Sequence, residues 1–202
     1  MPTPTPIDYY LAPQSPWAYL GHERFMRIAA DAGATVRVLP VDLGGKVFPV
    51  SGGLPLAQRP PQRQAYRLVE LARWRDFLKL PLNIKPKFFP VPADDAARLI
   101  IAVDQADGSA AAMRLTGAVL KAVWAQERDI ANAATRAELL AESGLAAQRA
   151  ADALTPEVQA TYERNTQQAI DAKVFGAPSY VVDGEIFWGQ DRLDFLQRRL
   201  NR

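Results

Sequence analysis

The chain of 202 residues is long enough to bury one full hydrophobic core, and it carries a net charge of +2. Its 24 basic residues are scattered, and no apolar run reaches the roughly 20 residues that span a bilayer, so neither nucleic acid nor a membrane is expected as a partner. The absence of cysteine and the single histidine, His22, exclude disulfides, thiolate nucleophiles and multi-histidine metal sites, and we expect no bound metal.

The opening of the chain is predicted to form a β-α-β unit. Residues 1–6 form a loose, proline-rich lead-in without the positive and apolar regions of a signal peptide, so we expect a cytoplasmic protein. β-favouring runs predict strands over 7–11 and 35–41, and Ser15-Pro16 is a typical helix start between them. A right-handed crossover makes these strands parallel, and it places Ser15 at the carboxyl edge of the sheet, where ligands usually bind.

The middle of the chain is predicted to be helical. It is rich in alanine, leucine and arginine and has little strand character. A loop rich in glycine and proline is predicted over 44–61. Helices are predicted next at about 62–79, 94–107, 109–126, 135–142, 146–152 and 156–173. We therefore expect an α/β domain made of residues 1–42 and 174–202, with an all-helical insertion domain at 43–173.

The segment 174–192 is predicted to form a β-hairpin followed by a helix. Pro178 precedes an apolar run, an Asp-Gly turn and a second apolar run, and Gly189 then opens the last helix. Proline is tolerated at the start of a strand, and a bend there often uses a cis bond. A cis Ala177–Pro178 bond would leave the amide and carbonyl of Ala177 facing outward, where an extended peptide can pair with them. The alternative is that Pro178 simply ends a helix.

Both ends of the chain resemble one group of proteins. Residues 176–185, Gly-Ala-Pro-Ser-Tyr-Val-Val-Asp-Gly-Glu, look like the segment by which thioredoxin-fold proteins present a cis-proline. The continuation over 187–193 and the run from Ser15 to Tyr19 resemble, more specifically, the 2-hydroxychromene-2-carboxylate isomerases and the kappa-class glutathione transferases. The resemblance covers nearly the full length. It implies a thioredoxin-like, DsbA-like α/β fold with a helical insertion, glutathione as cofactor, a small aromatic substrate and a homodimer.

Ser15 stands where redox-active relatives carry a Cys-x-x-Cys motif, so disulfide exchange by this chain is excluded. In the families that it resembles, this serine is proposed to donate a hydrogen bond to the sulfur of glutathione. A helix N-terminus favours a thiolate by about 0.3–1 kcal/mol, and a hydroxyl donor adds about 1.5–3 kcal/mol. The plainer interpretation is that Ser15 only caps the helix. His22 lies roughly 10 Å further along the same helix, too far to act as a base on Ser15, and is interpreted as a structural residue.

The resemblance implies a glutathione site at the second end of the chain. Gln190 and Asp191 lie at the predicted start of the last helix, where free amides suit a carboxylate and Asp191 suits an ammonium group. In the families, this Asp binds the γ-glutamyl group of glutathione. The residue before the cis-proline, which is Ala177 here followed by Pro178, pairs with the cysteinyl main chain. The alternative is a helix cap with an acidic residue in its first turn.

A third group of residues lies in the predicted insertion. It resembles a Lys-x-x-Tyr-x-x-x-Asp-x-x-Arg-Trp run of the isomerases and consists of Arg63, Tyr66, Glu70, Arg73 and Trp74 on one helical stripe. Arg63 is expected to pair with a carboxylate of glutathione or of the aromatic acid. The residues expected to wall the substrate pocket are Trp17, Tyr19, Trp74 and Phe89. The alternative is a solvated helix with a buried aromatic edge.

Three functions remain open from the sequence. The main hypothesis is a glutathione-dependent isomerase similar to 2-hydroxychromene-2-carboxylate isomerase, in which a thiolate adds reversibly to the unsaturated acid and leaves after a bond rotation. The second is a kappa-like glutathione transferase, which releases the adduct. The third is a non-catalytic, DsbA-like peptide-binding protein. Relatives usually carry Asn where this chain has Gly53 and Pro92, so the substrate pocket is where the chain departs from the family.

Overall fold

The predicted β-α-β unit is present in the computed structural model, which describes residues 5–201. It consists of β1 (Pro6–Leu11), α1 (Pro16–Asp31) and β2 (Thr35–Pro40). The two strands are parallel, as predicted. The predicted lead-in falls for the most part outside the described residues.

The predicted hairpin is also present, as β3 (Ser179–Val182) and β4 (Glu185–Trp188). Its turn residues Asp183 and Gly184 have φ values of 50° and 81°, the left-handed conformation that a tight two-residue hairpin turn needs. β3 pairs antiparallel with both β1 and β4, so the order of strands in the sheet is β2-β1-β3-β4. The Ala177–Pro178 bond is cis and leads directly into β3. Pro178 therefore begins the hairpin and does not end a helix.

The helices of the middle region begin and end close to their predicted positions. They are α3 (Pro61–Leu78), α4 (Asp94–Asp107), α5 (Ser109–Trp124), α6 (Ala133–Glu142), α7 (Arg149–Asp152) and α8 (Pro156–Asp171). The prediction of an uninterrupted loop before them is wrong. That stretch contains a π-helical turn (Leu43–Val47), α2 (Phe48–Ser51) and a 3-10 turn (Leu56–Gln58). Asp42 starts the first of these turns, because its carboxylate accepts a hydrogen bond of 2.7 Å from the amide of Gly45.

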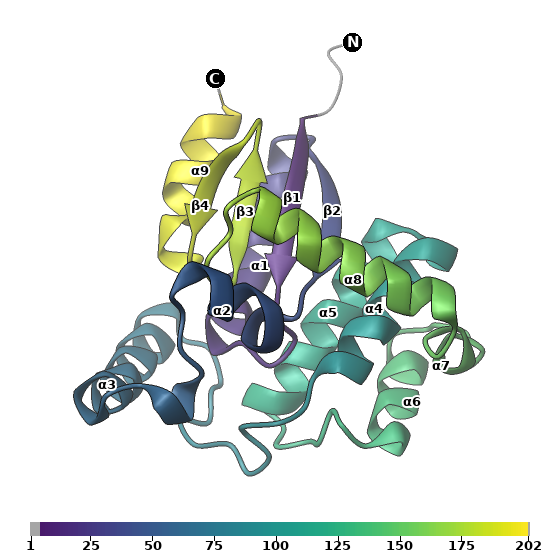
Figure 1. Cartoon of the computed structure of the whole chain (residues 1–202), viewed down its shortest axis with the longest axis horizontal. Coiled ribbons are helices and arrows are strands. Elements are labelled where there is room, and N and C mark those ends of the chain that lie inside the picture. The colour runs from purple at the N-terminus through teal and green to yellow at the C-terminus, as the bar shows by residue number, and fades with distance from the viewer. Residues whose placement is uncertain (1–4, 202) are drawn as a thin grey trace.

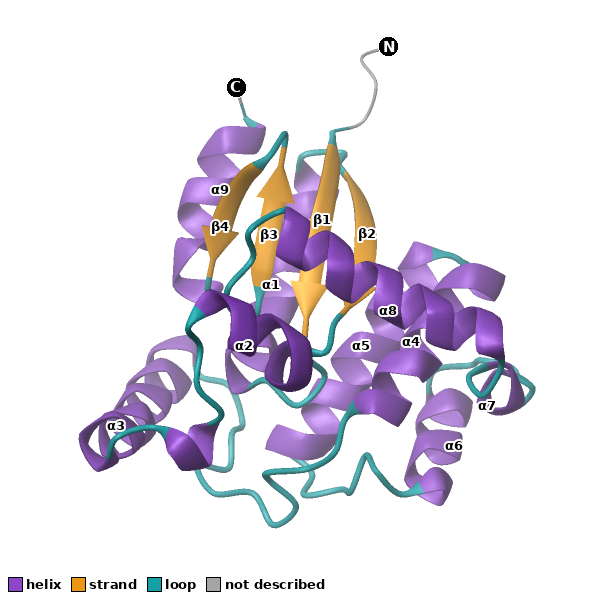
Figure 2. Ribbon diagram, in the orientation of Figure 1, coloured by secondary structure: helices purple, strands orange, loops and turns teal. Residues whose placement is uncertain are grey.

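Helices cover both faces of the sheet, with α1 and α9 (Leu193–Leu200) on one face and α8 across the other (Figures 1 and 2). Because neighbouring strand residues face opposite sides, Tyr9 lies in the core beneath α1, whereas Tyr10 packs with Ala169 of α8. Tyr9 stacks on Tyr180 of β3 at 5.3 Å between ring centroids. α4 and α5 continue the first of these cores beyond β2.

The end of the fold nearest the cis-proline differs from the prediction in one detail. Gly189 does not open the last helix directly, since a 3-10 turn, Gln190–Arg192, comes before α9.

α3 lies apart from the sheet, at the lower left of Figure 1. Within it, Arg67 and Leu71 are the buried residues. Among the helices that the structure describes, none has both the length and the apolar character to cross a membrane.

Candidate functional site

The two ends of the chain meet at Ser15. Its side-chain oxygen Oγ accepts a hydrogen bond of 3.2 Å from the amide of Ala18, which makes Ser15 the N-cap of α1. The same hydroxyl donates to the carbonyl of Ala177, the residue before the cis-proline, at 3.3 Å. This distance is long for a hydroxyl donor, whose bonds cluster near 2.7–2.8 Å. The hydroxyl proton is therefore weakly held and is available to a stronger acceptor.

The cis-proline loop is fixed from both sides by hydrogen bonds. The hydroxyl of Ser179 donates to the carbonyl of Gly176 at 2.7 Å. The amide of Gly189 donates to the carbonyl of Pro178 at 2.9 Å, which ties this loop to the turn after β4. At Gly176 a Cβ atom would lie 2.3 Å from the indole nitrogen of Trp188, so the loop needs glycine there to pack on that ring. The peptide before Pro178 is thus rigidly placed.

Backbone amides remain available around Ser15. Within residues 5–201, no hydrogen bond engages the amide of Ala177 or that of Trp17 in the first turn of α1. The carbonyl of Ala177, which the sequence predicted to face outward, is instead occupied by Ser15. The available donors and the positive end of α1 make this edge of the sheet favourable for an anion.

Gln190 and Asp191 have different environments. Gln190 is 1% exposed, and its side-chain oxygen accepts a hydrogen bond of 3.0 Å from Arg24, so its side chain serves the fold. The carboxylate of Asp191 is partly exposed and pairs with the neighbouring Arg192 at 2.8 Å. A surface pair of this kind contributes little stability, and its carboxylate can exchange partners at small cost. Of the two residues, Asp191 is the one whose side chain can meet a ligand.

Gly21 of α1 sets how closely the Gln190 turn approaches. A Cβ atom at this position would lie 2.7 Å from Cβ of Gln190 and 3.0 Å from the hydroxyl of Tyr180. We expect Gly21→Ala to lower the free energy of unfolding by about 1–2 kcal/mol, because overpacking outweighs the gain in helix propensity. Urea unfolding measures this change. Gly44→Ala is the control, since a Cβ there meets nothing within 4 Å, and equal losses in the two variants would contradict the prediction.

The predicted stripe on α3 lies at the surface. The side chain of Arg63 is exposed and makes no hydrogen bond or ion pair within residues 5–201. Glu70 pairs with Arg73 at 2.7 Å, and the Arg73 guanidinium lies 6.0 Å from the ring centroid of Tyr66. Trp74 is half-buried. Within residues 5–201, none of these side chains forms a hydrogen bond or an ion pair with Ser15.

The other predicted wall residues lie on two segments. Trp17 and Tyr19 belong to α1, and Phe89 belongs to the segment that follows α3. Trp17 is half-buried against the main core. The hydroxyl of Tyr19 donates to the carbonyl of Pro81 at 2.5 Å, and burial, with a smaller contribution from Glu23, raises the pKa of Tyr19 to about 12. Phe89 packs on Trp124 of α5, with 4.8 Å between ring centroids.

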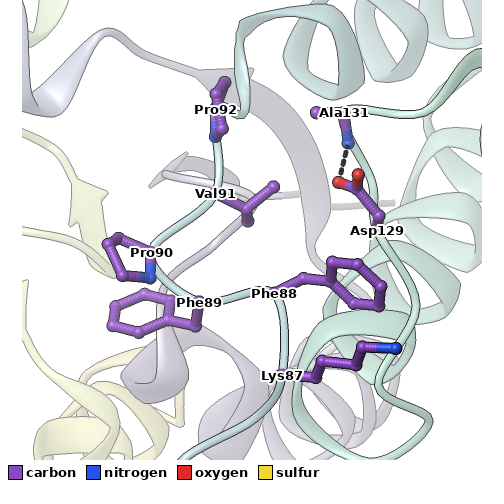
Figure 3. Close-up of a pocket in the computed structure, with 8 residues that line it drawn as sticks. All are labelled: Lys87, Phe88, Phe89, Pro90, Val91, Pro92, Asp129 and Ala131. Atoms are coloured by element: carbon purple, nitrogen blue, oxygen red, sulfur yellow. Dashed lines mark hydrogen bonds between the residues drawn. The ribbon is translucent and has the colours of Figure 1, made fainter.

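A hollow of about 460 Å³ lies beside residues 87–92, in the segment between α3 and α4 (Figure 3). It is lined by Lys87, Phe88, Phe89, Pro90, Val91, Pro92, Asp129 and Ala131. It is open to solvent and does not include Ser15. The carboxylate of Asp129 is occupied, because it accepts a hydrogen bond of 2.9 Å from the amide of Ala131. This hollow therefore does not form the candidate site.

Arg67 is a candidate residue that the sequence reasoning missed. It lies one turn after Arg63 on α3, and its side chain is buried, with the guanidinium carbon 5.0 Å from the ring centroid of Phe89 and 5.6 Å from that of Trp124. The only signal in the sequence is its i,i+4 spacing to the apolar Leu71, which marks the inner face of the helix. In the sequence, Arg63 and Arg67 cannot be distinguished as exposed and buried residues. The packing of α3 against Phe89 makes the difference.

His22 is buried and fully hydrogen bonded. Its Nε2 faces the carbonyl of Met113 at 2.9 Å, and its Nδ1 lies 3.3 Å from the hydroxyl of Tyr9. Because a carbonyl can only accept, Nε2 carries the proton and Nδ1 accepts from the tyrosine. Burial lowers the pKa of His22 to about 4. Its interpretation as a structural helix residue is confirmed, and the part of the chain that the structure describes holds no cluster of metal-binding side chains.

Comparison with known proteins identifies the family. A family model described as a DSBA-like thioredoxin domain matches residues 6–201. The chain belongs to this family. A 2-hydroxychromene-2-carboxylate isomerase from Pseudomonas putida is 28% identical over 97% of this chain and 94% of its own length. An isomerase of the same name from Sphingobium xenophagum is 29% identical over 96% and 97%.

Solved structures agree with the DSBA-like fold. The structure of a 2-hydroxychromene-2-carboxylate isomerase superposes with a TM-score of 0.76, at 24% identity, over 98% of this chain and 95% of that chain. The sequence-based prediction of a thioredoxin-like α/β fold with added helices is therefore confirmed. Unlike redox-active proteins of the DSBA-like fold, this chain places Ser15 at the start of α1 and has no cysteine anywhere.

Proposed function

We propose that this DSBA-like protein is a glutathione-dependent isomerase of an aromatic hydroxy-carboxylate such as 2-hydroxychromene-2-carboxylate. The observation that carries the proposal is the long hydrogen bond from Ser15 to the carbonyl of Ala177, beside the cis-proline. It leaves a hydroxyl donor at a helix N-terminus in a protein that has no thiol of its own. The isomerase names of its full-length relatives support the same reaction class.

The residues around Ser15 fit a tripeptide thiol. The amide of Ala177 has no partner among residues 5–201 and is suited to pair with the main chain of a peptide. Asp191 presents a carboxylate suited to an ammonium group. The hydrogen bond from the amide of Gly189 to the carbonyl of Pro178 joins the turn that carries Asp191 to the loop that carries Ala177. Glutathione supplies the sulfur nucleophile for reversible addition to the unsaturated acid.

Ser15 is proposed to stabilise the anionic sulfur. Its hydroxyl turns from the carbonyl of Ala177 to the charged acceptor, and the unpaired amide of Trp17 adds a second donor. A charge-assisted hydrogen bond contributes about 1.5–3 kcal/mol, and the helix N-terminus about 0.3–1 kcal/mol more. The pKa of a bound thiol is thereby lowered, which raises the fraction of nucleophile at neutral pH.

The deciding experiment follows the mass and the absorbance of the substrate. The purified protein is incubated with 2-hydroxychromene-2-carboxylate in the presence of glutathione, of S-methylglutathione or of no thiol. We expect isomerisation without change of mass, with glutathione only. A stable product heavier by one glutathione would indicate a kappa-like transferase instead. No turnover and no binding of glutathione by calorimetry would leave a peptide-binding protein.

The proposal extends to a homodimer that forms through α3. Tyr66, Val69 and Phe77 are exposed apolar residues at i, i+3 and i+11, which places them on one face of this helix. We expect sedimentation to show a dimer for the wild-type chain and a monomer for Phe77→Glu. A monomeric wild-type protein would contradict this part of the proposal. Phe195→Glu, at an exposed aromatic residue on α9, is the control that should leave the dimer intact.

A further inference from the structure

Arg67 is a buried cation without a counter-ion. Its side chain is 9% exposed, and its Nη2 atom has no hydrogen-bond partner within residues 5–201. None of the ion pairs among those residues includes it, and the nearest charge that affects it is another arginine, Arg59. An unpaired buried charge normally costs stability, and such groups are rare unless a ligand completes them.

The surroundings of Arg67 are electropositive. Burial and the charge of Arg59 lower the pKa of Arg67 to about 10, so that the guanidinium is still charged at neutral pH. Arg59 in turn is affected by Arg63, and it uses its Nε to donate to the carbonyl of Leu54 at 2.8 Å. No carboxylate within residues 5–201 forms an ion pair with Arg59, Arg63 or Arg67. The missing charge is that of an anion.

The walls of this position are aromatic, and one of them leads to Ser15. The Arg67 guanidinium lies against the rings of Phe89 and Trp124. The indole nitrogen of Trp124 donates to the carbonyl of Gln14 at 3.2 Å, and Gln14 directly precedes Ser15. The side-chain oxygen Oε1 of Gln14 is also buried without a partner. Arg67 and Gln14, which carry an unpartnered cationic donor and an unpartnered acceptor, therefore both contact Trp124.

We propose that Arg67 binds the carboxylate of the aromatic substrate, with Gln14 accepting from a hydroxyl of the same molecule. A flat hydroxy-carboxylate matches this site, because its anion meets the guanidinium while its ring packs against the partly exposed Phe89. This assignment rests on the proposed function and deepens it. It makes Arg67 a specificity-determining residue that holds the substrate beside the sulfur bound at Ser15.

The test uses salicylate, the smallest aromatic hydroxy-carboxylate, and its neutral analogue salicylamide. Binding is measured by calorimetry and by the change in tryptophan fluorescence. We expect Arg67→Met to weaken salicylate binding about 10- to 100-fold, the loss of one charge-assisted hydrogen bond, and Arg67→Lys to restore part of it. Salicylamide should bind weakly and equally to all forms. Arg75→Met is the matched control, since Arg75 lies on the same helix but pairs with Asp76.

Turnover separates this site from the proposed function. With active enzyme, Arg67→Met should raise KM for the substrate by a similar factor and change kcat much less. Unchanged salicylate binding and KM in Arg67→Met would refute the site while leaving the isomerase in place. Salicylate binding that depends on Arg67 in a protein without isomerase activity would refute the reaction and keep the site. Loss of glutathione binding with intact salicylate binding would overturn the assignment, since the carboxylate would then be that of glutathione.

Discussion

Ser15→Ala is expected to lower kcat/KM of the glutathione-dependent reaction about 10- to 150-fold. The substitution removes the hydroxyl that is proposed to hold the anionic sulfur, and 1.5–3 kcal/mol corresponds to this range. The pKa of bound glutathione should rise in parallel. A titration of the thiolate absorbance in the saturated complex measures that rise directly. Ser15→Thr keeps the hydroxyl and should retain most of the activity.

Ser15→Ala also removes the cap of α1, so loss of stability has to be separated from loss of function. We expect this cap to contribute about 1 kcal/mol to the free energy of unfolding. Thr155 caps α8 in the same way, by accepting from the amide of Val158, and it lies far from Ser15 along the chain. Thr155→Ala should therefore cost similar stability with unchanged turnover. An equal loss of turnover in both variants would reduce Ser15 to a structural cap.

The second large effect is a loss of stability in acid caused by His22. Its pKa is lowered from the ordinary value of 6.5 to about 4 in the folded protein, because it is buried. Between these two values the unfolded chain binds a proton that the folded chain does not bind, so stability falls as the pH is lowered. The full contribution is about 3 kcal/mol, present above pH 6.5 and lost by about pH 4.

The measurement compares wild type with His22→Gln, whose side-chain amide can still donate to the carbonyl of Met113. Urea unfolding at pH 7 and at pH 4.5 gives the loss on acidification for each protein. We expect the wild type to lose about 2–3 kcal/mol more than the variant over this interval. Carboxylates titrate in both proteins and cancel in the comparison. Equal losses would show that the imidazole is protonated in the folded state.

The fold could be predicted where short-range signals decide it. Ser15-Pro16 fixes the start of α1, and Asp183-Gly184 fixes the hairpin turn, because each depends on a few neighbouring residues. The helical turns after β2 escaped prediction. They depend on the side chain of Asp42 closing onto Gly45, which overrides the tendency of glycine and proline to form a loop.

For the candidate site, the sequence predicted which segments meet but not the contacts that their side chains make. The sequence located Ser15 and the cis-proline, but it could not show that the carbonyl of Ala177 is occupied or that the side chain of Gln190 turns toward Arg24. Both outcomes depend on contacts between distant segments. For the same reason the sequence does not single out Arg67, since helix periodicity does not show which stripe of α3 meets Phe89.

Gly53 is required by the placement of Phe48. A Cβ atom at this position would lie 2.1 Å from the ring of Phe48. Any larger residue at this position, including the asparagine that the family resemblance implies, would require the Phe48 ring to move.

The bond between Ser15 and Ala177 joins residues 162 positions apart. A chain still being synthesised has its serine early, and it acquires the partner loop only after a further 162 residues have been added. A copy of the chain that lacks either segment therefore cannot assemble the proposed site.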